Sequence, residues 1–453
     1  MDGASSHKSP APDAEGQACP IPQAHGRLHQ AHRLWHMALD SYPDADDFIL
    51  HLNSAIQGLR NVTFVLQNEM KGVIDDAERW YDAWREQMKA DPVMEWLNDS
   101  RVQVVHRGDL ETHSTARVGL LADWYGTRPI MEFDVPPFVS PHAVAVAVAG
   151  DLDLPEEIRR EGLLVVERRW VEARLPDWEL LDALAHCYGV VSQVLADAHQ
   201  QCGSRMLTVE AKDGNGPREL HRDHLGGRLP CMVASSARRT ARMHLASGDL
   251  LTSEEVEIPF DPENFELTAR EHYGLGEEEL EQLAAGARNV DDSFLRQGAF
   301  FADLAKRLLV KDGAHATIAF LYGPDGATAI RLEAEDQAQK YLAIQRVADK
   351  IRVNGADRLI YIAEVWEAAE DSLEPGQRPR DFPERTEALW VLALSAEGPE
   401  ASRQWYTPFS RGPSEEIVLG ETTSGWIAFP QFLMPVLMAW EEMWPTPPGD
   451  TRD

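Results

Sequence analysis

The stretch "PDADDFILHLNSAIQGLRNVTFVLQNEM", residues 43–70, decides the fold of the N-terminal part of the chain. Its apolar residues recur at alternating spacings of three and four, which places them on one face of a helix. Aspartates stand in its first turn, where they suit the positive end of the helix dipole. The apolar stripe consists of Phe48, Leu52, Ala55, Leu59, Val62, Leu66 and Met70. The stretch therefore predicts a long amphipathic helix that packs against other helices.

Three more helices are expected around this one. The segment 74–91 carries a second stripe of apolar and aromatic residues, which favours a core position. Asp91 and Pro92 then provide an N-cap and a first helical residue, so a third helix is expected to run from there until Gly108 ends it. Residues 175–201 show helical periodicity again. A fourth long helix is thus predicted to pack back on the first three.

The remaining segments predict a mixed α+β chain. Residues 117–137 and the alternating "HAVAVAVAG" at 142–150 are strand-like, which indicates an insertion. Near the C-terminus, Gly323-Pro324-Asp325-Gly326 between two strand-like runs predicts a hairpin, and a helix is expected to end near Gly355. The predicted parts are a disordered tail at 1–24, a helical domain at 25–202 with an insertion at about 112–165, a mixed segment at 203–310 and a C-terminal α+β domain at 311–453.

Charge and composition limit the classes of partner. The formal net charge is −32 and the isoelectric point is near 4.8, so the chain lacks the basic surface of an extended DNA-binding protein. Any RNA contact is expected to be local or to come through a partner. Four cysteines without a CxxC pair indicate reduced thiols and a cytoplasmic location. No apolar run reaches the roughly 20 residues of a membrane helix, so we expect no membrane partner.

A candidate catalytic pair, Arg101 and His106, lies in "RVQVVH" at the end of the third predicted helix. Cleavage of RNA without a metal needs proton transfer and a cation for the phosphate, which histidine and arginine can supply. The same spacing recurs at Arg27 with His32 and at Arg239 with His244. The alternative interpretation is that Arg101 pairs with a nearby acid and His106 only ends the helix.

Long amphipathic helices with an R-x4-6-H motif near the end of a later one resemble the HEPN (higher eukaryotes and prokaryotes nucleotide-binding) superfamily, over about residues 27–202. The resemblance implies an HEPN-like bundle and a metal-independent endoribonuclease, in a defence or toxin system, with Arg101 and His106 of two protomers meeting across a homodimer. Active members often carry Asn, Asp or His directly after the arginine, where this chain has Val102. Other members have lost catalysis, so the alternative is an inactive interaction or regulatory protein with a protein partner.

Two histidine clusters raise the question of a metal site. His25, His29, His32 and His36 share one helical face if the helix extends that far, but no acid or cysteine is expected to complete the set. A solvated face is the favoured interpretation. The stretch "ELHRDHLGG" offers His221, Asp223 and His224 in a glycine-rich context that predicts a loop. The sequence thus predicts neither a metal site nor a cofactor.

Overall fold

The computed structural model contains two compact units. It describes residues 19–204, 209–210, 218–219, 223–251, 270–271, 274–286, 294–368, 379, 382, 384–427 and 429–444. Unit 1 comprises Met1–Gly119, Pro129–Asp151 and Val165–Arg242, and unit 2 comprises Leu120–Arg128, Leu152–Leu164 and Met243–Asp453. Helices dominate the N-terminal part and antiparallel sheet dominates the C-terminal part. The predicted α+β class is confirmed.

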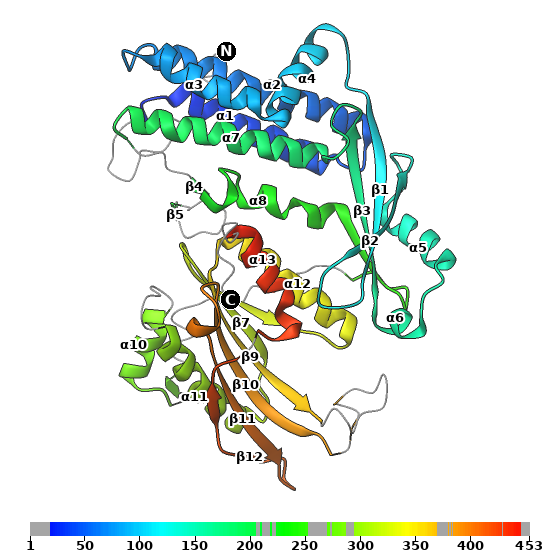
Figure 1. Ribbon diagram of the computed structural model, residues 1–453, viewed down its shortest axis with the longest axis vertical. Helices are drawn as coiled ribbons and strands as arrows, with labels where there is room; N and C mark the ends of the chain where they lie inside the picture. Colours follow the sequence, from blue (N-terminus) through cyan, green and yellow to red (C-terminus); the bar gives the residue numbers. More distant parts are fainter. Residues whose placement is uncertain are drawn as a thin grey trace, which may run out of the picture. The chain divides into compact units, whose positions relative to one another are not determined.

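Five long helices build the core of unit 1 (Figure 1). They are α1 (Pro22–Asp40), α2 (Ala45–Met70), α3 (Ala77–Ala90), α4 (Pro92–His106) and α7 (Leu180–Gln201). Helix α2 contacts each of the other four, and α7 lies against α1, α2 and α4. The predicted fourth helix therefore does pack back on the earlier ones. Helix α1 begins at Pro22, and Ile21 and Ala24 are buried, so the last residues of the predicted tail belong to the core.

The predicted stripe on α2 forms the centre of this core. All seven of its residues are at most 2% exposed. Asp44 caps the helix, since its side chain accepts hydrogen bonds from the amides of Asp46 and Asp47. Asp91 caps α4 in the same way, with Pro92 as the first helical residue. Local sequence signals thus fix where both helices begin.

A four-stranded sheet follows the first four helices, in the order β2-β1-β3-β6. Its strands are β1 (Thr112–Leu121), β2 (Arg128–Asp134), β3 (Leu163–Glu172) and β6 (Thr240–His244). The alternating "HAVAVAVAG" segment is not a strand, which corrects the prediction, because it lies in helix α5 (Pro141–Asp151). Ser140 caps this helix by accepting from the amide of Ala143 at 3.1 Å, and alanine favours helix strongly. Helix α6 (Glu156–Glu161) precedes β3.

Short elements connect α7 to β6. They are β4 (Val209–Glu210), β5 (Arg218–Glu219), η1 (Asp223–Leu225), α8 (Pro230–Val233) and η2 (Ala234–Arg239). The strands β4 and β5 pair antiparallel. Asp223 and His224 lie in η1, whereas His221 of the same predicted loop lies outside the described residues.

Unit 2 is built on a seven-stranded antiparallel sheet in the order β12-β11-β10-β9-β7-β8, with β13 also paired to β11. Its strands are β7 (Thr317–Gly323), β8 (Gly326–Leu332), β9 (Arg358–Glu367), β10 (Thr386–Ser395), β11 (Arg403–Arg411), β12 (Ile417–Leu419) and β13 (Thr423–Gly425). The predicted hairpin joins β7 to β8, and Gly326 has a φ of +111° that favours glycine. Gly355 ends helix α12 (Gln337–Asn354) in the left-handed region, as predicted.

Helices cover both faces of this sheet (Figure 1). Helix α12 and the terminal α13 (Met434–Met443) pack on one face, through residues such as Val347 and Val436. Helices α10 (Glu277–Gly286) and α11 (Phe294–Asp312) belong to the other, where Phe301 is buried. The Met- and Trp-rich terminal segment thus buries Trp440 in the core of this unit. Within the described part, no helix combines the length and apolar character needed to cross a bilayer.

Candidate functional site

The predicted pair Arg101 and His106 lies at the C-terminal end of α4. The guanidinium of Arg101 sits over the ring of Phe64, 5.7 Å from its centroid. His106 is the last residue of the helix and is exposed, and Val102 beside Arg101 is exposed as well. Among the described residues no hydrogen bond or ion pair joins Arg101 to His106. The fold therefore presents both groups near one helix end without assembling them into a site in one chain.

A second arginine shares the same aromatic ring. Arg60 lies 5.3 Å from the centroid of Phe64, and it donates to the amide oxygen of Asn98 at 3.0 Å. Burial lowers the pKa of Arg60, and the positive charge of Arg101 lowers it further. Phe64 itself is 43% exposed. Two cations and an accessible ring thus form a small basic and aromatic surface on an acidic protein.

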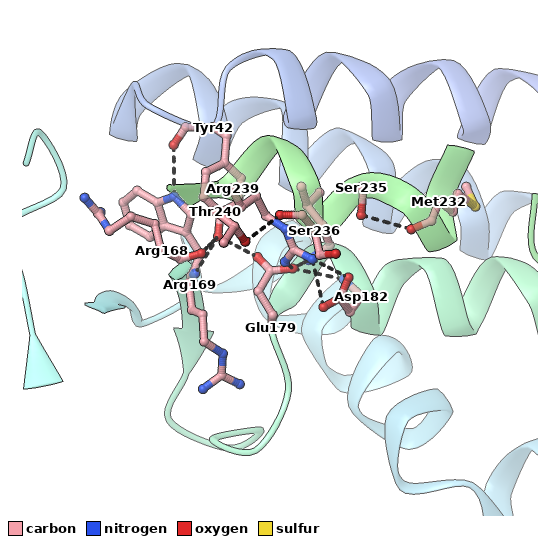
Figure 2. Close-up of polar contacts among 12 residues, drawn as sticks. Tyr42, Arg168, Arg169, Glu179, Asp182, Met232, Ser235, Ser236, Arg239 and Thr240 are labelled. Carbon is pink, nitrogen blue, oxygen red and sulfur yellow. Dashed lines mark hydrogen bonds and ion pairs between the residues drawn. The ribbon is translucent and has the colours of Figure 1, made fainter. Parts of the chain in front are cut away.

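Arg239, from one of the other two Arg/His spacings, is the centre of a buried ionic network (Figure 2). Its guanidinium forms an ion pair with Glu179 and contacts both carboxylate oxygens of Asp182, at 2.7 and 3.0 Å. Glu179 also accepts from the hydroxyl of Tyr42 at 3.0 Å and caps α7 through the amides of Leu181 and Asp182. Arg239 and Glu179 are almost completely buried. This network joins η2, the start of α7 and the α1–α2 turn, which is a structural role.

A polar cavity of about 400 Å³ opens beside this network. Its charged lining residues are Arg117, Glu167, Arg169, Asp177, Glu179 and Asp182. The carboxylate of Glu132 accepts hydrogen bonds from the two arginines of this lining, Arg169 at 2.5 Å and Arg117 at 3.2 Å. Burial raises the pKa of Glu167. Because the cavity's cations already have carboxylate partners, it shows no cationic site for an anionic ligand.

Two groups of cysteine and histidine residues converge along α1. In the first, which we call the α1–α8 cluster, His32, His36 and Cys231 bring their ligand atoms within 4.8 Å of one another. His32 Nε2 lies 3.2 Å from Cys231 Sγ and 3.0 Å from His36 Nε2. All three side chains are half-buried. Two imidazoles and one thiol in this arrangement are donors that Zn²⁺ prefers in proteins.

Glycines bring Cys231 to this position. Helix α7 contacts the loop before α8 at Gly189, where an added Cβ would lie 2.4 Å from the carbonyl oxygen of Gly226. Gly227 has a φ of +79°, and its added Cβ would lie 2.5 Å from the carbonyl oxygen of Gly189. Backbone can approach backbone this closely only without side chains. The glycine-rich loop therefore seats α8 against α7, with Cys231 beside α1.

The second group, the α1–α7 cluster, lies at the other end of α1. Cys19 Sγ is 3.7 Å from His25 Nδ1 and 3.7 Å from His199 Nε2. The two imidazole rings are nearly perpendicular, with centroids 5.6 Å apart. His199 is only 3% exposed. The cluster joins the start of α1 to the last turns of α7.

The sequence found the histidine face of α1 but not its partners. Helix α1 does extend to Pro22, so His25, His32 and His36 lie on one helix, and His29 is exposed outside both clusters. The expectation that no cysteine completes the set was wrong, because Cys19 and Cys231 each join a pair. Cys231 is 199 residues from His32, and no local pattern reports such a contact.

Comparisons with known proteins extend over nearly the whole chain. The family model described as bacteriophage lambda protein ea47 matches residues 12–450. Protein ea47 of Escherichia phage lambda is 25% identical over 386 residues, which cover 84% of this chain and 87% of that protein. No solved structure matches the chain.

These matches overturn the HEPN resemblance. That resemblance rested on amphipathic helices and one Arg/His spacing within about residues 27–202, and neither is specific to a family. The family match instead includes the strands and helices of both units. The chain therefore belongs to the bacteriophage lambda Ea47 family.

Proposed function

We propose that this protein binds Zn²⁺ at the α1–α8 cluster, through His32, His36 and Cys231. The proposal is supported by two contacts of His32 Nε2, which lies 3.0 Å from His36 Nε2 and 3.2 Å from Cys231 Sγ. Two imidazole nitrogens and one sulfur thus converge from two segments that are far apart in the sequence. Thiolate and neutral imidazole together favour zinc over Mg²⁺ and Ca²⁺, which prefer oxygen.

The spacing of the ligand atoms suits a tetrahedral ion. With bonds of about 2.0–2.1 Å to nitrogen and about 2.3 Å to sulfur, tetrahedral ligand atoms lie about 3.4 Å (N to N) or about 3.6 Å (N to S) apart. The observed separations of 3.0 and 3.2 Å are somewhat shorter. Small outward rotations of the half-buried side chains would open the cluster to the required size. His32 and His36, one helical turn apart, are already on the same face.

Three protein ligands leave one coordination position for another group. Structural zinc sites have four protein ligands, whereas catalytic sites keep an exchangeable position for water or substrate. The half-exposed side chains of this cluster give solvent access to that position. The proposed function is therefore a zinc site that accepts an exchangeable oxygen or nitrogen ligand, in a helical unit held together by its own core.

Metal analysis of the purified full chain tests this proposal. Cys231→Ser and His32→Ala should each lose zinc at this cluster, because each removes one of three ligands. His29→Ala is the matched control, since His29 is an exposed histidine of the same helix outside both clusters. Inductively coupled plasma mass spectrometry gives the zinc content per chain after dialysis. Equal zinc content in Cys231→Ser and the His29 control would exclude the site.

The ribonuclease expected from the sequence is a second proposal, now without the HEPN family. In a homodimer that acts on RNA, Arg101 would supply the positive charge that binds the phosphate, and His106 would transfer the proton. The alternative is an inactive protein that binds a regulatory partner. One observation favours RNA contact here: Arg60 and Arg101 flank the exposed ring of Phe64. Cations can bind the nucleic-acid backbone while an aromatic ring stacks on a base.

A further inference from the structure

We infer that the α1–α7 cluster, Cys19, His25 and His199, is a second metal site, which takes Zn²⁺ and fastens the start of α1 to the end of α7. It goes beyond the zinc site proposed at the α1–α8 cluster, because it uses none of the same residues. The two sites would lie along one helix: His25 and His32 are seven residues apart, or about 10 Å at 1.5 Å per residue.

The geometry of this cluster fits a zinc ion closely. Cys19 Sγ lies 3.7 Å from both imidazole nitrogens, and a nitrogen and a sulfur on tetrahedral zinc lie about 3.6 Å apart. All three ligand atoms are within 4.8 Å of one another. No ligand atom has to move far for an ion to bind between them.

The second nitrogen of His199 is held by a hydroxyl group. His199 Nδ1 lies 3.1 Å from Ser204 Oγ, and Ser204 Oγ donates its own proton to the carbonyl oxygen of His199 at 3.2 Å. The serine oxygen can then accept from Nδ1–H of His199. In that tautomer Nε2 carries a lone pair, and Nε2 is the atom that faces Cys19. Metal-binding histidines typically have such a partner on the other nitrogen.

The position of the cluster indicates that an ion here would stabilise the fold, with water in the fourth coordination position that the three side chains leave open. Cys19 and His199 are 180 residues apart, and the neighbouring Ile21 and Ala24 are buried in the helical core. His199 itself is buried, unlike the half-exposed ligands of the α1–α8 cluster. An ion here would cross-link two distant helix ends in the folded state only, so its binding energy would add to the stability of unit 1.

Cobalt titration of the metal-free full chain tests this inference, because a Co²⁺–thiolate bond gives an absorption band that a hydrogen-bonded thiol lacks. The informative protein is Cys231→Ser, in which only the α1–α7 cluster keeps its sulfur. It should bind one Co²⁺ with a thiolate band and should melt at a lower temperature in EDTA. Cys19→Ser/Cys231→Ser should show neither effect, and His199→Ala in the Cys231→Ser background should lose the band.

The outcomes separate the two sites. Wild type should bind two ions, and Cys19→Ser and Cys231→Ser one each, with circular dichroism confirming that each variant is folded. Binding lost in Cys19→Ser but kept in Cys231→Ser would refute only the α1–α8 site. A folded Cys231→Ser protein that binds no Co²⁺ would overturn this inference and leave a thiol that only hydrogen-bonds to two imidazoles. A band that survives in the double variant would overturn it as well.

Discussion

Replacing Arg239 with methionine removes the only guanidinium that forms an ion pair with Glu179 among the described residues. The change keeps a long apolar side chain in place but leaves the carboxylate, 2% exposed, without its cation. Removing one partner of a buried ion pair costs about 3–5 kcal/mol of unfolding free energy when the other partner is ionised, so the loss is expected above pH 7, where Glu179 is charged in wild type. The matched control is Arg238→Met. Arg238 pairs with Asp40 at 2.9 Å on the surface, so its loss should cost less than about 1 kcal/mol.

The destabilisation by Arg239→Met should depend on pH in a defined direction. Burial raises the pKa of Glu179 to about 7 in the folded protein, against a reference value of 4.5. Because the pKa is higher in the folded state, the contribution of Glu179 to the free energy of unfolding is fully present below pH 4.5. It declines as the pH rises, by about 1.4 kcal/mol per pH unit, until the pH reaches the folded pKa. In wild type the contribution of Glu179 stops declining near pH 7. Without the guanidinium the pKa of Glu179 rises further, so the variant should continue to lose stability between pH 7 and 9.

Urea unfolding at pH 5, 7 and 9, followed by circular dichroism and tryptophan fluorescence, measures both effects. Because the chain has two units, the transition of the helical unit must be followed separately from that of the other. Adding Glu179→Gln to Arg239→Met should remove the extra slope above pH 7, since the buried carboxyl group that forms the ion pair with Arg239 is then gone. A loss at pH 9 for Arg239→Met no larger than for Arg238→Met, or parallel pH curves for variant and wild type, would refute the reasoning.

Three further predictions concern single sites. If the chain cleaves RNA at the end of α4, His106→Ala should lower the rate about a hundredfold on total RNA in EDTA, while His244→Ala cleaves like wild type; equal rates would eliminate that site. Gly298→Ala should lower the free energy of unfolding by about 1–3 kcal/mol in thermal unfolding, because the new Cβ would lie 2.7 Å from Trp405. Its control, Gly26→Ala, should stabilise the protein by about 0.5–1 kcal/mol, because the new Cβ in this helix would have no atom within 4 Å. Ile21→Ala should cost about 2–5 kcal/mol, since Ile21 is fully buried; an unchanged melting temperature would mean that the segment before α1 does not pack.

Local signals account for what the sequence predicted well. The stripe on α2, the Asp91–Pro92 start of α4 and the hairpin between Gly323 and Gly326 each depend on residues a few positions apart, and all three are present. The alternating Ala/Val segment at 142–150 misled the prediction, because alternation alone does not distinguish a strand from an alanine-rich helix with a serine cap.

The candidate sites were harder to predict, for a different reason. Arg101 and His106 attracted attention because they are close in sequence, but spacing along one helix says nothing about what each side chain contacts. His32 and Arg239 belong to the two other copies of the same spacing, and the structure gives one a cysteine partner and the other a buried carboxylate. Those partners come from distant segments, so only the tertiary fold reveals them.

The distance in sequence between His32 and Cys231 has a consequence for synthesis of the chain on the ribosome. Helix α1 emerges early, but the sulfur follows 199 residues later, about 10–40 s at bacterial elongation rates of roughly 5–20 residues per second. During that interval His32 and His36 would be exposed to cellular metals without the thiol of Cys231. Helix α7, which completes the core around α2, also arrives late. A nascent chain stalled after α7 but before residue 231 would therefore hold the ligands of the proposed α1–α7 site and lack the sulfur of the proposed α1–α8 site, so zinc at the α1–α8 cluster would mark the arrival of α8.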